Sequence, residues 1–113
     1  MKAQSQITEI MARNRLINDL LNDGLEVAGP LRDCGIDLIV YAAFDRSPFI
    51  AIPIQMKASR NTSFSVDGKY ERIPKLVIAY VWGLAKPTQT ATYALTYSEL
   101  FSVVRENEYC AFR

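Results

Sequence analysis

Two segments of the chain have the hydrophobic spacing of helices, one near each end. Over residues 4–22, apolar side chains recur every three or four positions, which predicts an α-helix with one buried stripe. Leu16 and Leu20 lie beside this stripe, so a second side of the helix is expected to be partly covered. The helix should end near Gly24, a residue suited to a C-terminal cap. The predicted stripe consists of Ile7, Ile10, Met11, Ile17 and Leu21.

A capping-box pattern predicts the start of the second helical segment. Thr96 is followed three residues later by Glu99, and this T-x-x-E spacing is typical of a helix start. The residues that follow, 98–107, predict a helix near the end of the chain.

Between these segments the chain carries runs of β-branched and apolar residues, which are typical of strands. The run from Pro74 to Gly83 suits a central strand that is buried on both faces. Residues 44–48 have turn chemistry, and residues 60–71 are expected to form a loop, with or without a short hairpin. The sequence therefore predicts an α/β (α+β) fold: a central mixed sheet of about four to five strands with an N-terminal and a C-terminal helix. The expected strands are 25–28, 36–43, 49–59, 74–83 and 90–97.

Composition narrows the functional classes. The 113 residues, half of them apolar, correspond to a single domain spanning 1–113. A net charge of +1 neither indicates nor excludes nucleic-acid binding, and the lack of histidine excludes histidine-based catalysis and histidine metal sites. Cys34 and Cys110 form no CxxC pair, so we expect reduced thiols in a cytoplasmic protein, although a single bridge stays possible. A signal peptide and a membrane-spanning run are not expected, which predicts no membrane partner.

Two polar residues interrupt the apolar strand "FIAIPIQMKAS", residues 49–59. Because strand side chains alternate, Gln55 and Lys57 share one face, with Cα atoms roughly 6.5–7 Å apart. Ile50, Ile52, Ile54 and Met56 share the other face, which is expected to be buried. Pro53 lacks an N–H group, so it predicts either an unpaired edge or a bulge, and a bulge would shift the register by one residue.

A hairpin between the strands 36–43 and 49–58 adds Asp37 to this pair. It places Asp37 opposite Gln55, Met56 or Lys57, and strand alternation favours a register in which Asp37 shares the face of Gln55 and Lys57. Carboxylate, carbonyl and water oxygens are the ligands that magnesium prefers, and a neighbouring lysine can orient a water or stabilise a phosphate. The set predicts metal-assisted phosphodiester hydrolysis. The simpler interpretations are a loop-end aspartate bound to backbone beside Gly35, and a strand running out into solvent.

The segments "GIDLIVY" and "IPIQMKAS" together resemble the core of the PD-(D/E)xK nuclease superfamily, and the likeness covers roughly residues 5–58. The resemblance implies a restriction-endonuclease-like fold and hydrolysis of DNA with Mg²⁺ or Mn²⁺. It implies Asp37 as the central metal ligand, Gln55 as the second ligand and Lys57 as the catalytic lysine. Glu9 on the first helix would be the fourth member, both catalytic and metal-binding. The closest likeness is to variants with glutamine in place of the acid, as in some small homing endonucleases.

The chain departs from the motif at two positions. Ile36 replaces the proline, and Gln55 replaces a carboxylate, which removes one ligand charge. Glu9 also has a simpler interpretation, a surface ion pair with Arg13 four residues away. Glu26 is a substitute candidate for the acid.

The segment 57–75 has five basic residues against Asp67 and Glu71, a local excess of three positive charges. It predicts phosphate contacts, with an ordinary solvated loop as the alternative. Trp82 and the tyrosines at 80, 93 and 97 are predicted to be core residues. The candidate nucleic-acid contacts are Lys57, Ser59, Arg60, Lys69 and Arg72.

These features together predict a magnesium-dependent deoxyribonuclease that acts on DNA. Because a domain of this size offers little surface for DNA reading, we expect a homodimer or a higher homo-oligomer. The alternative is a catalytically inactive nuclease-fold module that binds nucleic acid or protein in a defence, mobile-element or repair system. A third possibility is a structural domain without a site, in which Asp37 and Lys57 would lie on opposite faces.

Overall fold

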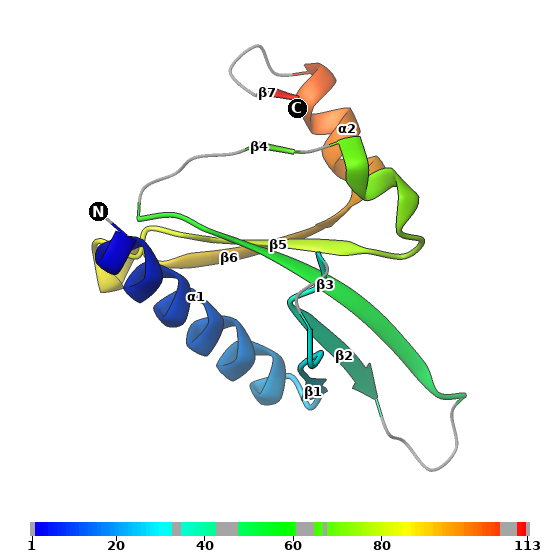
Figure 1. The fold of residues 1–113 in the computed structure, drawn as a ribbon, viewed down its shortest axis with the longest axis horizontal. Coiled ribbons are helices and arrows are strands. Elements are labelled where there is room, and N and C mark those ends of the chain that lie inside the picture. Colours follow the sequence, from blue (N-terminus) through cyan, green and yellow to red (C-terminus); the bar gives the residue numbers. More distant parts are fainter. Residues whose placement is uncertain are drawn as a thin grey trace.

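A five-stranded mixed sheet forms the centre of the protein, with strand order β1-β2-β3-β5-β6 (Figure 1). Strands β3 and β5 are parallel, and the other neighbours are antiparallel. This sheet, with one helix near each end of the chain, confirms the predicted α+β class. The elements are α1 (Lys2–Asn22), β1 (Glu26–Ala28), β2 (Leu38–Ala42), β3 (Ile50–Ala58), β4 (Ser65–Val66), the 3₁₀ helix η1 (Gly68–Arg72), β5 (Val77–Trp82), the 3₁₀ helix η2 (Pro87–Gln89), β6 (Ala91–Thr96), α2 (Tyr97–Glu106) and β7 (Ala111–Phe112).

The computed structural model describes residues 2–32, 35–42, 48–60, 65–66, 68–106 and 111–112. Most of the predicted turn at 44–48 lies outside the described residues, and so do Cys34 and Cys110. The short hairpin allowed for in 60–71 is replaced by β4 and η1, and β4 pairs in parallel with β7. In the described ranges, no helix has both the length and the apolar character that crossing a membrane requires.

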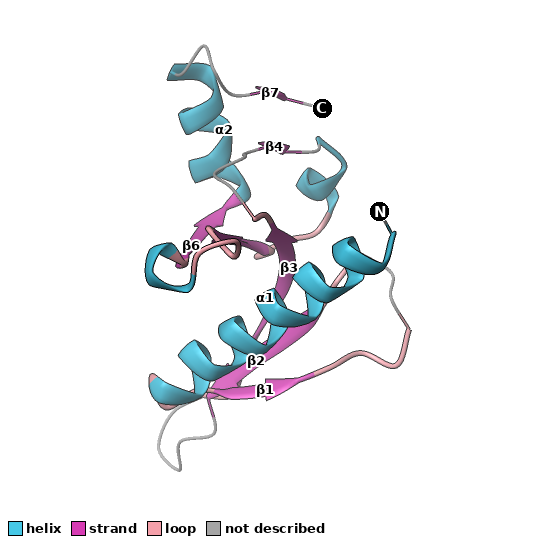
Figure 2. Ribbon diagram, turned by 90° about the vertical axis from the view of Figure 1, so that its left-hand side faces the viewer, coloured by secondary structure: helices cyan, strands magenta, loops and turns pink. Residues whose placement is uncertain are grey.

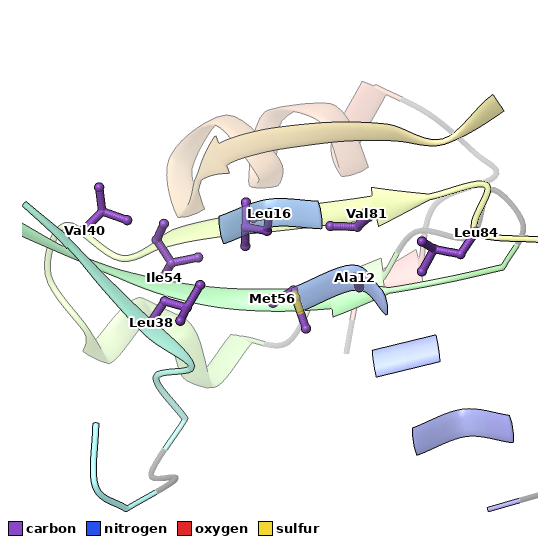
Figure 3. Packing of buried hydrophobic residues seen from close by; sticks show 9 residues of the cluster. Ala12, Leu16, Leu38, Val40, Ile54, Met56, Val81 and Leu84 are labelled. Carbon is purple, nitrogen blue, oxygen red and sulfur yellow. The ribbon is translucent and has the colours of Figure 1, made fainter. Parts of the chain in front are cut away.

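The two long helices lie on opposite sides of the sheet (Figure 2). Helix α1 packs against β1, β3 and β5, and the residues between them form an aliphatic core cluster (Figure 3). The other face carries a second cluster that is rich in aromatic residues and is covered by η1 and α2. The first cluster contains Ala12, Leu16, Leu38, Val40, Ile54, Met56, Ala79, Val81 and Leu84, and the second contains Tyr70, Leu76, Ile78, Tyr80 and Leu100.

The stripe predicted as the buried face of α1 is mostly wrong. Ile7, Ile10, Met11 and Leu21 are exposed, with Ile10 at 59%. The side that packs on the sheet carries Thr8, Ala12, Leu16 and Leu20, the side that was expected to be only partly covered. The short side chains of Thr8 and Ala12 allow the helix to pack close to the sheet. The buried side of α1 is therefore set by how closely it can pack and not by which side carries the largest apolar residues.

Strand β3 is longer than its parallel partner, and this explains its uneven burial. Pairing with β5 begins at Ile54, so the first residues of β3 pair with β2 alone. The prediction of a buried face is therefore confirmed for Ile54 and Met56 and is wrong for Ile50, which is 55% exposed. Pro53 lies in the part of β3 that has an open side, which agrees with the predicted unpaired edge.

The start of α2 confirms the predicted capping box. The Glu99 backbone N–H donates to Thr96 Oγ1 at 3.3 Å, and the Thr96 backbone N–H donates to Glu99 Oε1 at 3.0 Å. Two N–H groups that the helix end leaves without intrahelical partners are thereby satisfied. The cap sets the point at which the chain leaves β6 and turns over the second face of the sheet.

Candidate active site

Asp37 lies immediately before β2, where the chain enters the sheet beside β3. Its backbone N–H donates to the Ile54 carbonyl at 2.8 Å, and its Oδ2 accepts a hydrogen bond from the Met56 N–H at 2.7 Å. Leu38 pairs with Ile54, so the acid comes opposite Gln55, within the predicted register. The carboxylate is thus fixed to the backbone between Gln55 and Lys57. This contact also replaces the simpler interpretation of a hydrogen bond near Gly35 with one across the two strands.

Gln55 and Lys57 lie on the second face of the sheet, the face of η1 and α2. Their partners on β5 are Ile78 and Tyr80, both members of the second core cluster. Neighbouring strand residues point the other way, because Ile54 and Met56 belong to the cluster under α1. Lys57 is only half-exposed and remains paired within the sheet, so the strand does not run out into solvent at this point.

The position of Asp37 follows from the register of β2 and β3 extended by one residue, which sets it opposite Gln55. The next residue, Leu38, belongs to the cluster under α1, so strand alternation extended to Asp37 predicts the opposite side for it. This register favours the same face for Asp37 and Lys57 over opposite faces. Asp37, Gln55 and Lys57 thus come from the start of β2 and the last residues of β3, with the Asp37 carboxylate bound to the backbone of Met56 between the other two.

The amide of Gln55 has an unusual environment. Its Oε1 is buried, and no described residue donates a hydrogen bond to it. A buried acceptor without a partner costs about 1–3 kcal/mol relative to a satisfied one. Buried polar atoms of this kind are few in native proteins, and a catalytic role, an ion or a water is among their explanations.

Lys57 is held by an aromatic side chain that the sequence analysis did not select. Its Nζ lies 5.4 Å from the centroid of the Tyr70 ring, and Lys69 Nζ lies at 5.4 Å from the same ring. Tyr70 is 2% exposed and comes from η1. In the sequence, Tyr70 could have been noticed as an aromatic residue next to Lys69 within the otherwise polar segment 60–71.

Glu9 approaches from the other side of the sheet. It is exposed on α1 and lines a pocket of about 170 Å³ with Ser5, Thr8 and residues 56–58 of β3. Asp37 and Gln55 do not line this pocket, so Glu9 meets the end of β3 but not the acid–amide pair. The structure shows no ion pair between Glu9 and Arg13, both of which it describes.

The substitute acid Glu26 lies farther from the site. It is on β1 opposite Tyr41, four residues along β2 from Asp37, which corresponds to about 13 Å of strand. Glu26 is therefore not adjacent to the acid–amide pair.

The predicted phosphate-contacting residues fall into two groups. Ser59 and Arg60 continue past β3, and their carbonyls accept from the N–H groups of Leu84 and Ala85 at 3.4 Å and 3.2 Å. Lys69 and Arg72 are exposed on η1. Both groups belong to the segment between β3 and β5, and Lys69 Nζ lies at the same distance from the Tyr70 ring centroid as Lys57 Nζ.

The aromatic residues predicted as core divide in the same way. Tyr80 is buried, and Trp82 and Tyr97 pack against the second cluster. Tyr93 is 51% exposed on β6, where its ring contacts Trp82 with a centroid distance of 5.2 Å. The core assignment for Tyr93 is wrong because β6 is the last strand of the sheet and leaves one flank open.

The donor atoms present suit a weak magnesium site. Asp37 contributes a carboxylate whose Oδ1 has no hydrogen bond to a described residue, and Gln55 contributes its buried Oε1. No cluster of three or more His, Cys, Asp or Glu side chains suited to a metal occurs among the residues that the structure describes. Magnesium commonly takes one or two protein carboxylates and fills its other positions with water and substrate phosphates. The pair fits such an ion, with substrate completing the coordination.

The fold and this geometry define an α+β sheet protein with an acid–amide–lysine set on two paired strands. Comparisons with protein-family models, with curated protein sequences and with solved structures each gave no match.

Proposed function

We propose that this protein is a metal-dependent endonuclease that hydrolyses phosphodiester bonds in DNA. The observation that carries the proposal is the hydrogen bond from the Met56 N–H to Asp37 Oδ2, which fixes the acid beside a Gln-x-Lys sequence on the paired strand. The resemblance to the PD-(D/E)xK superfamily requires this relation, an acid at the start of one strand and the lysine motif on the next. The buried, unpartnered Oε1 of Gln55 supports it independently.

In this proposal Asp37 and Gln55 hold Mg²⁺ or Mn²⁺, and Glu9, which contacts the end of β3 from α1, is not assigned to the same ion. The ion, when bound, polarises the phosphate and lowers the pKa of a coordinated water. Asp37 needs no rearrangement, because the Met56 N–H already fixes its carboxylate. Lys57 places its ammonium on the same face, where it offsets negative charge that develops on the phosphate or orients the attacking water.

The proposed substrate is held by the basic residues around this face. Lys57, Arg60 and Lys69 would neutralise backbone phosphates, with Ser59 and Arg72 at the margin. A 113-residue chain offers little area compared with the 1,000–2,500 Å² that specific DNA interfaces typically bury, so we propose a homodimer or larger assembly. We also propose a cytoplasmic location, in keeping with the reduced thiols expected from the sequence.

Cleavage assays test the proposal directly. Purified protein is incubated with duplex, branched and single-stranded DNA in Mg²⁺, in Mn²⁺ and in a chelator. We expect metal-dependent cleavage of at least one substrate, lost in Asp37→Ala and in Lys57→Ala and kept in Asp23→Ala, which removes an exposed acid after α1. Cleavage that survives both site substitutions would refute the assignment.

The second candidate is a nuclease-fold module that binds nucleic acid or protein without cutting. It is favoured by Gln55, which leaves Asp37 as the only carboxylate adjacent to the amide among the described residues. Calorimetry with Mg²⁺, in the presence and absence of DNA, separates the two. DNA binding without any metal-dependent heat and without cleavage would select the binding module.

A further inference from the structure

Two ammonium groups from different elements converge on one aromatic ring beside the proposed site. Lys57 Nζ and Lys69 Nζ each lie 5.4 Å from the Tyr70 ring centroid, so they are at most twice that distance apart. Lys57 comes from β3 and Lys69 from η1. The ring itself is 2% exposed and belongs to the second core cluster, so its position is set by packing.

Both side chains that contact the ring are positively charged. Lys57 forms no ion pair with a carboxylate in the described part of the chain. The negative face of an aromatic ring attracts a cation, but the ring itself carries no net charge. A phosphate that contacts both ammonium groups would gain two charge-assisted hydrogen bonds.

We propose that Lys57 and Lys69 form a two-cation clamp on the nucleic-acid backbone, with Tyr70 as the residue that positions both. The inference rests on the proposed function for its ligand, a phosphodiester. It adds a residue, Tyr70, and a role for η1: the segment after β3 folds back so that Lys69 reaches the same phosphates as Lys57. Lys69 then contributes to binding, and Tyr70 contributes to binding and to the placement of Lys57.

The role of Lys69 is measured by the salt dependence of DNA affinity. The affinity for a fluorescent duplex is determined by anisotropy over a range of KCl concentrations, without divalent metal. Each phosphate contact contributes about 0.9 to the slope of log K against log salt, so Lys69→Gln should reduce the slope by about 1. Lys86→Gln is the matched control, because Lys86 is an exposed lysine between β5 and β6, next to Leu84 of the α1-side cluster. It should leave the slope unchanged.

The role of Tyr70 is measured by nuclear magnetic resonance and by cleavage kinetics. In the wild type, the ring current of Tyr70 should displace the ε-methylene proton shifts of Lys57. Tyr70→Phe keeps the ring and should keep both this displacement and the cleavage rate. Tyr70→Leu removes the ring and should abolish the displacement and lower the single-turnover rate by up to about 100-fold, the scale of a misplaced catalytic group.

The outcomes separate this inference from the proposed function. If the wild type binds and cleaves DNA but Lys69→Gln keeps the wild-type salt slope, the clamp is refuted and the nuclease assignment stands. If Tyr70→Leu folds and matches Tyr70→Phe in both shift and rate, the positioning role is refuted. If the wild type neither binds nor cleaves DNA, the proposed function fails and the clamp fails with it.

Discussion

The two faces of the sheet differ in chemistry, although strand β3 contributes residues to both. Under α1, Ile54 and Met56 of β3 join an aliphatic cluster covered by a 21-residue helix. On the other face, Gln55 and Lys57 lie beside aromatic residues under the shorter cover of η1 and α2. The difference shows how one strand can support a packed core and a polar site at once: alternation assigns the two tasks to alternate residues.

The polar face also shows how each chemical group is tolerated near a core. A buried polar group is costly unless it finds a partner. Asp37 has the Met56 N–H, and Lys57 has the ring of Tyr70. Gln55 Oε1 is the member of the set without a donor among the described residues, so it is the position at which a ligand has most to contribute.

The largest expected effect is on the polar face, in Asp37→Asn. The substitution keeps the size of the side chain but removes the charge that holds a cation. We expect the cleavage rate to fall by at least about 100-fold, in the range typical of lost acid–base or metal-binding groups. Single-turnover cleavage in Mg²⁺ is the measurement. Thermal unfolding of the same samples should show a folded protein, and Asp23→Asn should cleave like the wild type.

The α1 face is tested by comparing two substitutions on one helix. Leu16→Ala removes a side chain that is 3% exposed in the aliphatic cluster, and it should lower the free energy of unfolding by about 2–5 kcal/mol. Ile10→Ala acts on a side chain that is 59% exposed and should change it by less than about 0.5 kcal/mol. Urea denaturation measures both. Equal losses would contradict the observed orientation of α1.

Gln55→Met tests whether the buried amide oxygen on the polar face lowers stability and supports metal-dependent cleavage. Methionine is similar in size but has no strong acceptor, so the unpartnered oxygen disappears from the buried position. We expect the free energy of unfolding to rise by about 1 kcal/mol, while metal-dependent cleavage is lost. Urea denaturation and the cleavage assay measure the two quantities. Gln89→Met, at an exposed position of η2, should change neither. A destabilised Gln55→Met would indicate that the amide already has a partner.

The sequence predicted the features that depend on local patterns. The capping box at Thr96, the apolar strand β5 and the pairing of β2 with β3 all follow from rules of short range, and all three are confirmed. The same pairing predicted Asp37 opposite Gln55, Met56 or Lys57, and the observed register selects Gln55.

The features that the sequence did not predict depend on tertiary contacts. The orientation of α1 is one example. Ala12 is buried against the sheet, whereas a prediction from the spacing of large apolar residues gives alanine little weight. Tyr70 is another, since its meeting with Lys57 depends on how the segment after β3 folds back. The exposure of Tyr93 depends on β6 being the last strand, which is a property of strand order.

The smallest expected effect concerns the cover of the polar face, at the start of α2. Glu99 Oε1 accepts hydrogen bonds from the Thr96 backbone N–H and from the Thr96 hydroxyl. The backbone hydrogen bond, and to a smaller extent the hydroxyl, lower the pKa of the Glu99 carboxyl below its ordinary value of 4.5. The folded protein therefore binds this proton more weakly than the unfolded chain does. The contribution to stability is complete above pH 4.5 and is lost as the pH falls through the folded pKa.

Denaturant unfolding at a series of pH values below 4.5 measures this contribution. Glu99→Gln should show a shallower loss of stability with falling pH than the wild type. Thr96→Val removes the hydroxyl donor but keeps the backbone N–H, so it should fall between the two. An unchanged dependence of stability on pH in Glu99→Gln would contradict a stabilising role for the Glu99 carboxylate at the start of α2. The helix that covers the second face would then be held by its packing alone.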